Sequence, residues 1–422
     1  EFRRVLFRSA GLFMNSGVEE VTLPAGVTVL TAQMFSGAVN LKKLTVLGNL
    51  TTTFTTYYPG YSTESYRSYG TFYGNELLEE IVFAGSTTSL GANLFRGMHT
   101  SVPTTITFKG DVGSIGYYAF NAFDGLKSVT FEGDVATLDY STFEACETIE
   151  NVDFNGDVGL VNYRALYGAE NLKEVNFNGA LNQVSYYAFY NCHSLEKVTF
   201  KGKVGTFGMG TAQGQRFSTG PTYMGYHIFT NCRSLESVTF EQDVDTIGAC
   251  AFFNCRGLVE LNFFGDISRI DPYAFAFDTT LESVDFNNVF TLGDYAFYND
   301  AALERVTYEN ILTYGSYVFA ETSLKAYELP EDYTIGNVFD SEGLFYNSNL
   351  ESFVLPKGVT AVPNYFFAGC ANLANVTVLG ELVEVGEQAF YGTAITDFTL
   401  GDSLEAVDRA ALAGSPITEV EV

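Results

Sequence analysis

One short motif returns along almost the whole chain, and it decides which class of fold the chain can adopt. It is clearest in YAFYNCHSLEKVTF (187–200), IFTNCRSLESVTF (228–240) and AFFNCRGLVELNF (251–263). We take the first Phe of the shared Phe-x-Asn-Cys frame, or a Leu in its place, as the anchor of each repeat. The motif recurs about 17 times at a period of about 22 to 23 residues, which is typical of a solenoid. The anchors are Phe13, Phe35, Phe72, Phe95, Phe120, Phe143, Leu166, Phe189, Phe229, Phe252, Phe275, Phe297, Phe319, Phe345, Phe367, Phe390 and Leu412.

Most repeats carry an apolar pattern that is typical of a half-buried strand. In the run Leu195, Val198, Phe200, the last two side chains alternate with Thr199, so they point inward while the threonine points outward. No repeat can bury its own Phe and Leu, so neighbours must stack, each strand about 4.8 Å from the next in a parallel sheet. A Gly-Asp turn, a second apolar pair and a Tyr-Ala-Phe segment follow, and we expect the last to be a short helical turn.

The sequence therefore predicts a repeat solenoid of the leucine-rich-repeat kind. It should have one short parallel strand per repeat of about 22 to 23 residues, short helical or irregular connections, and about 17 repeats. A globular chain of 422 residues usually divides into several domains. A solenoid grows in one dimension, so we expect residues 10–422 to form a single continuous domain.

Both ends of the chain depart from the repeat. Residues 1–9 fit no repeat frame, and their Arg-Val-Leu-Phe-Arg-Ser run resembles the translated end of a sequencing adapter, so we expect a non-native artefact there. The last residues, ITEVEV, end on a strand pattern without the polar capping repeat that solenoids need. We expect a fragment truncated at both ends, with any export signal or wall anchor in the missing parts.

The Leu-x-x-Val-x-Phe strand and the Ile-Gly-x-Tyr-Ala-Phe-x-Asn-Cys-x-Ser-Leu type of connection carry a family resemblance over nearly the whole chain. They resemble the BspA-like leucine-rich repeat family of bacterial surface proteins. The resemblance implies a secreted or surface-anchored interaction scaffold, and members of the family are described as adhesins for host matrix glycoproteins.

The charge balance argues against nucleic acid as a partner. Fifty acidic residues against 22 basic ones give a formal net charge of −28, whereas a phosphate backbone requires a basic stripe. An anionic membrane surface is disfavoured for the same reason, and no stretch is apolar for long enough to span a bilayer. We interpret the charge as keeping a long, strand-rich molecule soluble; attraction of a basic partner or calcium is the alternative.

No catalytic, cofactor or metal site can be assembled from the sequence. The suggestive pair Cys192 and His193 fails because the Cys recurs with the repeat frame and the His does not. The three His residues have no second ligand at metal-site spacing, and the run Asp153 to Asp157 lacks the other ligands of a calcium loop. The sequence therefore favours a protein that is not an enzyme and needs no cofactor.

The six cysteines are better explained as core residues. Five share one position of the repeat, three residues after the anchor, which predicts a column of buried thiols that act as small apolar side chains. Cys250 and Cys255 are close in sequence, but a disulfide between them is disfavoured. The five in the shared position are Cys146, Cys192, Cys232, Cys255 and Cys370.

The outward positions of successive strands form the first candidate binding surface, because repeat proteins bind through such columns. Short polar side chains here could hydrogen-bond a sugar or a peptide backbone, although Thr is also common on any exposed strand. The column reads Thr107, Thr130, Asp153, Asn176, Thr199, Thr239, Asn262, Asp285 and Thr307, and the candidate ligands in it are Asp153, Asn176, Thr199, Thr239, Asn262 and Asp285.

Two insertions that lengthen the repeat form the second candidate surface. NLTTTFTTYYPGYSTESY (49–66) and GMGTAQGQRFSTGPTYMGY (208–226) mix Tyr, Phe and small hydroxyl residues with almost no charge, a composition common in binding surfaces. The alternative is that their aromatic rings fold back onto the solenoid flank. The candidate ligands are Tyr57, Tyr58, Tyr61, Tyr66, Arg216, Phe217, Tyr223 and Tyr226.

A column of tyrosines two residues before the anchor is more readily explained by packing than by binding, because it recurs with the fold. Its members are Tyr118, Tyr187, Tyr273, Tyr295, Tyr317 and Tyr365.

These observations favour an extracellular or cell-surface bacterial recognition or adhesion scaffold that binds a protein or glycan, with a host matrix glycoprotein as the partner that the resemblance implies. A passive stalk that displays another domain is the first alternative. A carbohydrate-binding accessory region of a larger enzyme is the second.

Overall fold

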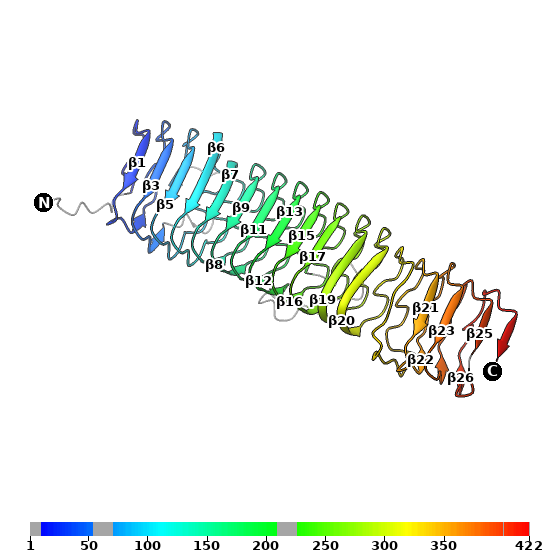
Figure 1. The fold of residues 1–422 in the computed structure, drawn as a ribbon. Helices are drawn as coiled ribbons and strands as arrows, with labels where there is room; N and C mark the ends of the chain where they lie inside the picture. The colour runs from blue at the N-terminus through cyan, green and yellow to red at the C-terminus, as the bar shows by residue number, and fades with distance from the viewer. Residues whose placement is uncertain (1–9, 54–70, 209–225, 400, 422) are drawn as a thin grey trace. The chain divides into compact units, whose positions relative to one another are not determined.

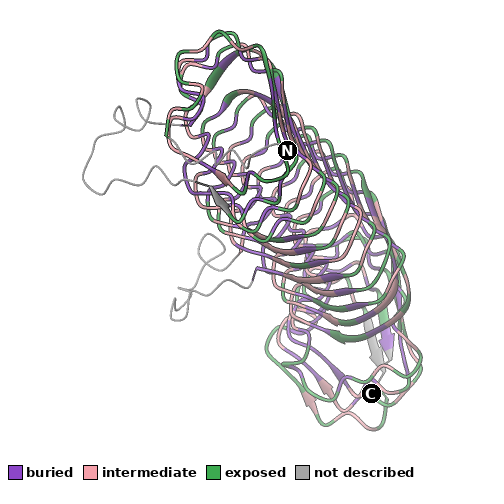
Figure 2. Ribbon diagram, turned by 90° about the vertical axis from the view of Figure 1, so that its left-hand side faces the viewer, coloured by how far each residue is buried: buried purple, intermediate pink, exposed green. Residues whose placement is uncertain are grey.

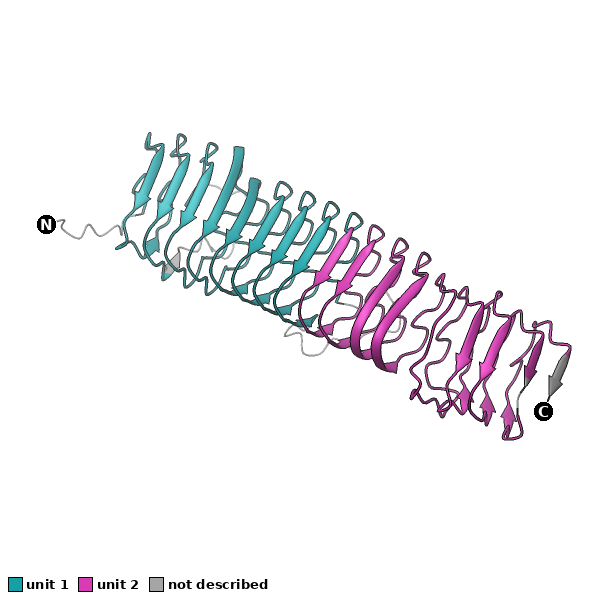
Figure 3. Cartoon of the chain, viewed as in Figure 1, with its two compact units in different colours: residues 1–215, 226–235 teal, residues 216–225, 236–422 magenta. Residues whose placement is uncertain are grey.

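The computed structural model describes residues 10–53, 71–208, 226–399 and 401–421, and these form short parallel strands joined by turns, without any helix (Figure 1). They divide into two compact units: unit 1 comprises residues 1–215 and 226–235, and unit 2 comprises residues 216–225 and 236–422 (Figure 3). Each unit is a stack of repeats of the predicted kind, so the expected parallel solenoid is confirmed. The expected continuity of residues 10–422 stays a prediction.

In unit 1 the predicted Leu-x-x-Val-x-Phe strands form one series, and the second apolar pairs form another. The first series contains β1 (Glu20–Leu23), β3 (Lys43–Val46), β5 (Glu80–Phe83), β6 (His99–Phe108), β7 (Asp124–Phe131), β9 (Asn151–Phe154), β11 (Glu174–Phe177) and β13 (Lys197–Phe200). The second contains β2 (Val29–Leu30), β4 (Thr52–Thr53), β8 (Val135–Leu138), β10 (Val158–Val161), β12 (Leu181–Val184) and β14 (Val204–Phe207).

The strands pair in a register that places equivalent residues of neighbouring repeats side by side. Val175 of β11 lies opposite Val152 on one side and Val198 on the other, and Phe177 lies between the corresponding phenylalanines. The rings of Phe154 and Phe177 stack with centroids 4.9 Å apart and planes within 3°, close to the spacing of neighbouring strands. Figure 2 shows the same buried positions returning from turn to turn.

Unit 2 follows the same plan with two longer strands. The first series contains β15 (Ser237–Phe240), β17 (Glu260–Phe263), β21 (Ser352–Leu355), β23 (Asn375–Val378), β25 (Asp397–Thr399) and β27 (Glu419–Glu421). The second contains β16 (Val244–Ile247), β18 (Ile267–Ile270), β22 (Ala361–Val362), β24 (Glu384–Val385) and β26 (Ala406–Val407), while β19 (Ser283–Leu292) and β20 (Arg305–Tyr314) extend through both positions.

The two long strands are continuous because their turn is one residue shorter. Between β17 and β18, the three residues 264–266 separate the buried Phe263 from the buried Ile267. In β19 only the two residues 287–288 lie between the equivalent Phe286 and Val289. Asn288 and Val289 pair with Asn310 and Ile311 in β20, so the ladder runs through without a turn.

The Tyr-Ala-Phe segments are turns and not the expected short helical turn. In the described repeats, the residue two positions before each anchor and the residue two positions after it have a positive φ, which is the left-handed backbone conformation. In one repeat these are Tyr187 (φ 56°) and Asn191 (φ 60°), and a left-handed residue stops a right-handed helix from propagating. Backbone N–H groups here bond to the next repeat instead, as in Phe189 N to Ile228 O at 2.9 Å.

The Gly-Asp turns form a ladder of their own. The Asp134 carboxylate accepts the Asp157 N–H at 2.8 Å, and the Asp157 carboxylate accepts the Ala180 N–H at 2.8 Å. A Cβ on Gly156 would lie 2.6 Å from the backbone carbon of Gly133 in the preceding repeat. Glycine is therefore required here by the close approach of neighbouring turns, and the Asp binds the next turn.

The expected thiol core is confirmed. All six cysteines are buried and free, so Cys250 and Cys255 form no disulfide. Burial raises the pKa of Cys146 and Cys250 to about 12, which keeps both thiols protonated and unreactive at neutral pH.

Candidate binding site

In the outward strand column of unit 1, two of the candidate ligands are hydrogen-bonded to each other. Asn176 Nδ2 donates to Asp153 Oδ1 at 2.9 Å, and both side chains are half-buried. Thr199 differs from the prediction, because this residue is only 7% exposed and its buried hydroxyl has no hydrogen-bond partner among the described residues. Thr199 is therefore not an exposed ligand in the described structure.

The corresponding column of unit 2 pairs in the same way. Asn262 Nδ2 donates to Thr239 Oγ1 at 3.5 Å, and the Thr307 hydroxyl donates to the Asp285 carboxylate. Asp285 and Thr307 are exposed, while Thr239 and Asn262 are half-buried. Three pairs of neighbouring residues in the column, one in unit 1 and two in unit 2, are thus hydrogen-bonded to each other.

Most candidate residues of the two insertions lie outside the described residues: Tyr57, Tyr58, Tyr61, Tyr66, Arg216, Phe217 and Tyr223. Tyr226 is described, and its ring stacks on Tyr186 with centroids 5.3 Å apart. A Cβ on Gly208 would lie 2.1 Å from the Tyr226 ring, so the ring packs tightly on this backbone. For Tyr226 the structure supports the alternative in which the insertion's aromatic residue packs on the solenoid.

The tyrosine column also packs, as expected from its recurrence. Tyr295 stacks on Tyr273 at 4.7 Å and on Tyr317 at 5.0 Å, with planes within 4° in each pair. Burial raises the pKa of Tyr273 and Tyr317 to about 12, and nearby tyrosines add to the effect.

Cys192 and His193 lie in different environments. Cys192 is fully buried and its thiol donates to Leu166 O at 3.3 Å, whereas His193 is exposed. The pair is thus a core thiol beside a surface imidazole.

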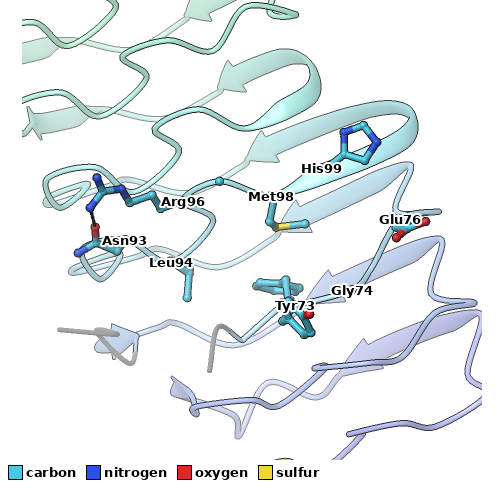
Figure 4. Close-up of a pocket in the computed structure, with 10 residues that line it drawn as sticks. Tyr73, Gly74, Glu76, Asn93, Leu94, Arg96, Met98 and His99 are labelled. Carbon is cyan, nitrogen blue, oxygen red and sulfur yellow. Dashed lines mark hydrogen bonds between the residues drawn. The ribbon is translucent and has the colours of Figure 1, made fainter. Parts of the chain in front are cut away.

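A cavity in unit 1, which the sequence did not indicate, gathers side chains of a different kind (Figure 4). It has a volume of about 310 Å³ and lies between two successive repeats. Figure 4 shows Tyr73 and Met98 on neighbouring turns, with Arg96 and Asn93 at one end and His99 and Glu76 at the other. The lining residues are Phe72, Tyr73, Gly74, Glu76, Asn93, Leu94, Arg96, Gly97, Met98 and His99.

Arg96 is held in a defined orientation beside this cavity. Its Nε donates to Asn121 Oδ1 and its Nη1 donates to Asn93 Oδ1, each at 3.2 Å, and the guanidinium carbon lies 4.7 Å from the centroid of the Tyr118 ring. A planar guanidinium fixed in this way loses little conformational entropy when it binds a further acceptor.

Polar groups and one exposed ring complete the cavity. Tyr73 is 49% exposed, and at the opposite end His99 Nδ1 lies 2.7 Å from Asp124 Oδ2. The aromatic face of Tyr73 can stack on a ring of a ligand. The Arg96 guanidinium, the Glu76 carboxylate and the His99 imidazole can form directional hydrogen bonds with it.

Sequence reasoning missed this site although a signal was present. Tyr73 and Arg96 each directly follow an anchor, so they occupy the same position in consecutive repeats. A comparison of the residues at that position would have placed them side by side.

Among the described residues, no group of three or more His, Cys, Asp or Glu side chains could hold a metal ion. Over the same ranges, no helix is long and apolar enough to cross a membrane.

A family model described as a BspA type leucine-rich repeat region matches residues 9–102, 100–215, 222–342 and 341–422. No curated protein sequence matches the chain as a relative.

Several solved structures are similar in fold. A leucine-rich repeat protein from Bacteroides ovatus is 18% identical, with 74% of this chain and 85% of that chain covered and a TM-score of 0.45. A leucine-rich cell-surface protein from Faecalibacterium prausnitzii is 16% identical, with 86% and 88% covered and a TM-score of 0.32. A leucine-rich repeat protein from Leptospira interrogans is 11% identical, with 95% and 89% covered and a TM-score of 0.32.

Proposed function

Because the chain belongs to the BspA-type leucine-rich repeat family, we propose that it is a recognition module of a bacterial cell-surface or secreted protein. The module is not an enzyme, and it binds a protein or glycan partner such as a host matrix glycoprotein. The family membership and the stacked-repeat fold support the scaffold role.

The cavity beside Tyr73 is the observation that carries this proposal. On the strand columns, Asn176 is bonded to Asp153 and Asn262 to Thr239, whereas the cavity combines an exposed ring with the fixed Arg96 guanidinium. A sugar ring or a flat side chain of a partner would stack on Tyr73, while its hydroxyl, amide or carboxylate oxygens accept hydrogen bonds from Arg96.

A passive stalk is the second candidate function. The self-paired strand columns favour it, because a surface that satisfies its own hydrogen bonds offers less to a partner. A carbohydrate-binding accessory role is distinguished from both by binding to an isolated polysaccharide.

The test is a binding screen of the full chain against a glycan array and immobilised matrix glycoproteins, with the variant Tyr73→Ala beside it. We expect the wild-type chain to bind, and Tyr73→Ala to bind at least about tenfold more weakly, because aromatic anchors dominate many interfaces. Tyr391→Ala is the matched control, since Tyr391 also directly follows an anchor and is 47% exposed; it should bind as the wild type does.

Each other outcome has a meaning. Equal binding of all three proteins would place recognition on the strand column or in the insertions and would overturn the role of the cavity. A folded wild-type chain that binds nothing would favour the stalk.

A further inference from the structure

The position three residues after each anchor is called here the thiol position. Four cysteines at this position, Cys146, Cys192, Cys232 and Cys370, donate a hydrogen bond from their thiol to the preceding repeat. Cys146 Sγ donates to the carbonyl oxygen of the preceding anchor, Phe120, at 2.9 Å, and Cys370 does the same to Phe345 at 3.0 Å. Where the thiol position holds a cysteine, the side chain is thus buried and carries a neutral donor.

Two consecutive repeats of unit 2 place a carboxyl group at this position. Asp278 and Asp300 are both 0% exposed, and each has one oxygen, Oδ1, bonded to the preceding repeat: Cys255 N donates to Asp278 at 2.7 Å, and Asp278 N donates to Asp300 at 2.9 Å. The other oxygen, Oδ2, is buried in both residues and has no hydrogen-bond partner among the described residues.

Among the residues that the structure describes, no basic side chain lowers the pKa of either carboxyl group. The ion pairs of the neighbouring repeats, Arg269 with Asp271 and Lys325 with Glu304, engage other carboxylates. The two aspartates are neighbours in the column of thiol positions. Cys255 precedes Asp278 in this column and Thr322 follows Asp300, so neither end of the pair carries a positive charge. An ionised carboxylate here would be buried without a counter-charge, which is strongly unfavourable.

Burial raises the pKa of both carboxyl groups well above the usual aspartate value, and the charge of Asp300 adds to this effect for Asp278. Backbone N–H groups lower the pKa of both carboxyl groups, but burial has the larger effect. The N–H group of Cys255 acts on Asp278, and the N–H groups of Asp278 and Phe277 act on Asp300. The direction of the pKa shift agrees with the geometry, in which Oδ2 of each carboxyl group is buried and receives no hydrogen bond from the described residues.

We propose that Asp278 and Asp300 form a pH-sensitive carboxyl pair, which stabilises unit 2 as two neutral acids and weakens it when their protons are lost. Each neutral acid supplies an O–H donor at the position from which the thiols elsewhere donate to the preceding anchor carbonyl. The pair is therefore a neutral substitute for two cysteines, and its stabilising effect falls as the pH rises above the pKa of an unfolded aspartate.

The sign of the pH dependence follows from the raised folded-state pKa. Below the pKa of an unfolded aspartate, about 4, both states are protonated and the stabilisation is complete. Above it the unfolded chain ionises while the folded chain does not, so stability falls as pH rises toward the folded-state pKa. Each carboxyl that ionises only on unfolding raises the unfolding equilibrium constant about tenfold per pH unit.

The experiment is urea unfolding of the full chain, followed by circular dichroism from about pH 5 to pH 8, for the wild type and for the double variant Asp278→Asn, Asp300→Asn. Asn keeps the Oδ1 acceptor and cannot ionise. We expect the unfolding constant of unit 2 to rise by up to about a hundredfold per pH unit in the wild type, and the double variant to lose this dependence and to unfold at higher urea at neutral pH.

A second double variant separates this effect from the general repulsion of an acidic chain. Glu260→Gln, Glu282→Gln removes the same two charges from exposed positions of the same unit, and it should keep the wild-type pH dependence. If the Asn variant does not fold, Asp278→Cys, Asp300→Cys restores the residue that other repeats carry.

An infrared measurement observes the protons directly. At neutral pH the wild type should show the absorption of a protonated carboxylic acid, and the Asn and Cys variants should lack it. A wild type without this absorption, or a pH dependence that survives removal of both aspartates, would overturn the proposal.

Discussion

At the residue scale, the fold depends on two left-handed positions around each anchor. Asn and Gly, which tolerate positive φ, occur often at the second position, as in Asn191 and Gly168. Other repeats place Ala145 or Phe277 there at the same φ. The stacked neighbours therefore impose this conformation even where the local sequence resists it.

This predicts opposite effects for two substitutions in consecutive repeats. Ala145→Gly should stabilise the chain by about 0.5 to 1 kcal/mol, because Ala145 is exposed and its left-handed φ of 58° costs more for alanine than for glycine. Gly168→Ala should destabilise by a similar amount, since a Cβ there meets nothing within 4 Å and only the φ of 67° opposes it. Urea unfolding measures both, and the same sign for both changes would contradict the account.

The sequence reveals much at this scale when repeats are compared by position. The buried thiols were predictable because five cysteines share one position. Asp278 and Asp300 stand at that same position, so their burial was also readable from the sequence. Their protonation was not, because it depends on the absence of a nearby cation in the folded structure.

At the element scale, the first strand of each repeat was predictable and the second was not. In β11 the residues alternate between half-buried and buried, which is the strand signature. In β10 only Val158 and Val161 are buried, with two half-buried residues between them. Two apolar residues that are three positions apart do not show the period of two that identifies a strand in the sequence. The second strand forms because its backbone pairs with the equivalent strands of neighbouring repeats.

The Gly-Asp ladder gives a test of how closely the elements approach. Gly156→Ala should destabilise the chain by about 1 to 3 kcal/mol, because its Cβ would meet backbone atoms of the preceding turn and force the repeats apart. Gly26→Ala is the control, since a Cβ there meets nothing within 4 Å and its φ is not positive, and its effect should stay within about 0.5 kcal/mol. Equal unfolding midpoints for the two variants would show that the turns are not tightly stacked.

At the scale of the whole molecule, part of the net charge of −28 has a structural use. Asp111, Asp134 and Asp157 each accept the backbone N–H of the next turn, and hydrogen bonds to charged acceptors are stronger than neutral ones. Part of the acidic excess therefore helps to hold neighbouring repeats together.

The candidate site was the least predictable feature at this scale. The strand columns could be read from alternation, but their self-pairing could not, because it depends on contacts between repeats such as Asn176 with Asp153. The cavity beside Tyr73 lies between two repeats that carry different side chains, Tyr73 and Arg96, at one position. A regular repeat thus predicts its scaffold well, and the recognition site that we propose lies where two neighbouring repeats differ.

The most direct test of this account is photo-crosslinking from within the cavity. A photoreactive benzoylphenylalanine would replace Tyr73 in one full-length protein and Tyr391 in another, and each would be irradiated with the glycoprotein that binds the wild type best. The account predicts a crosslinked product from position 73 and none from position 391. Equal products from both positions, or a product from position 391 alone, would contradict it.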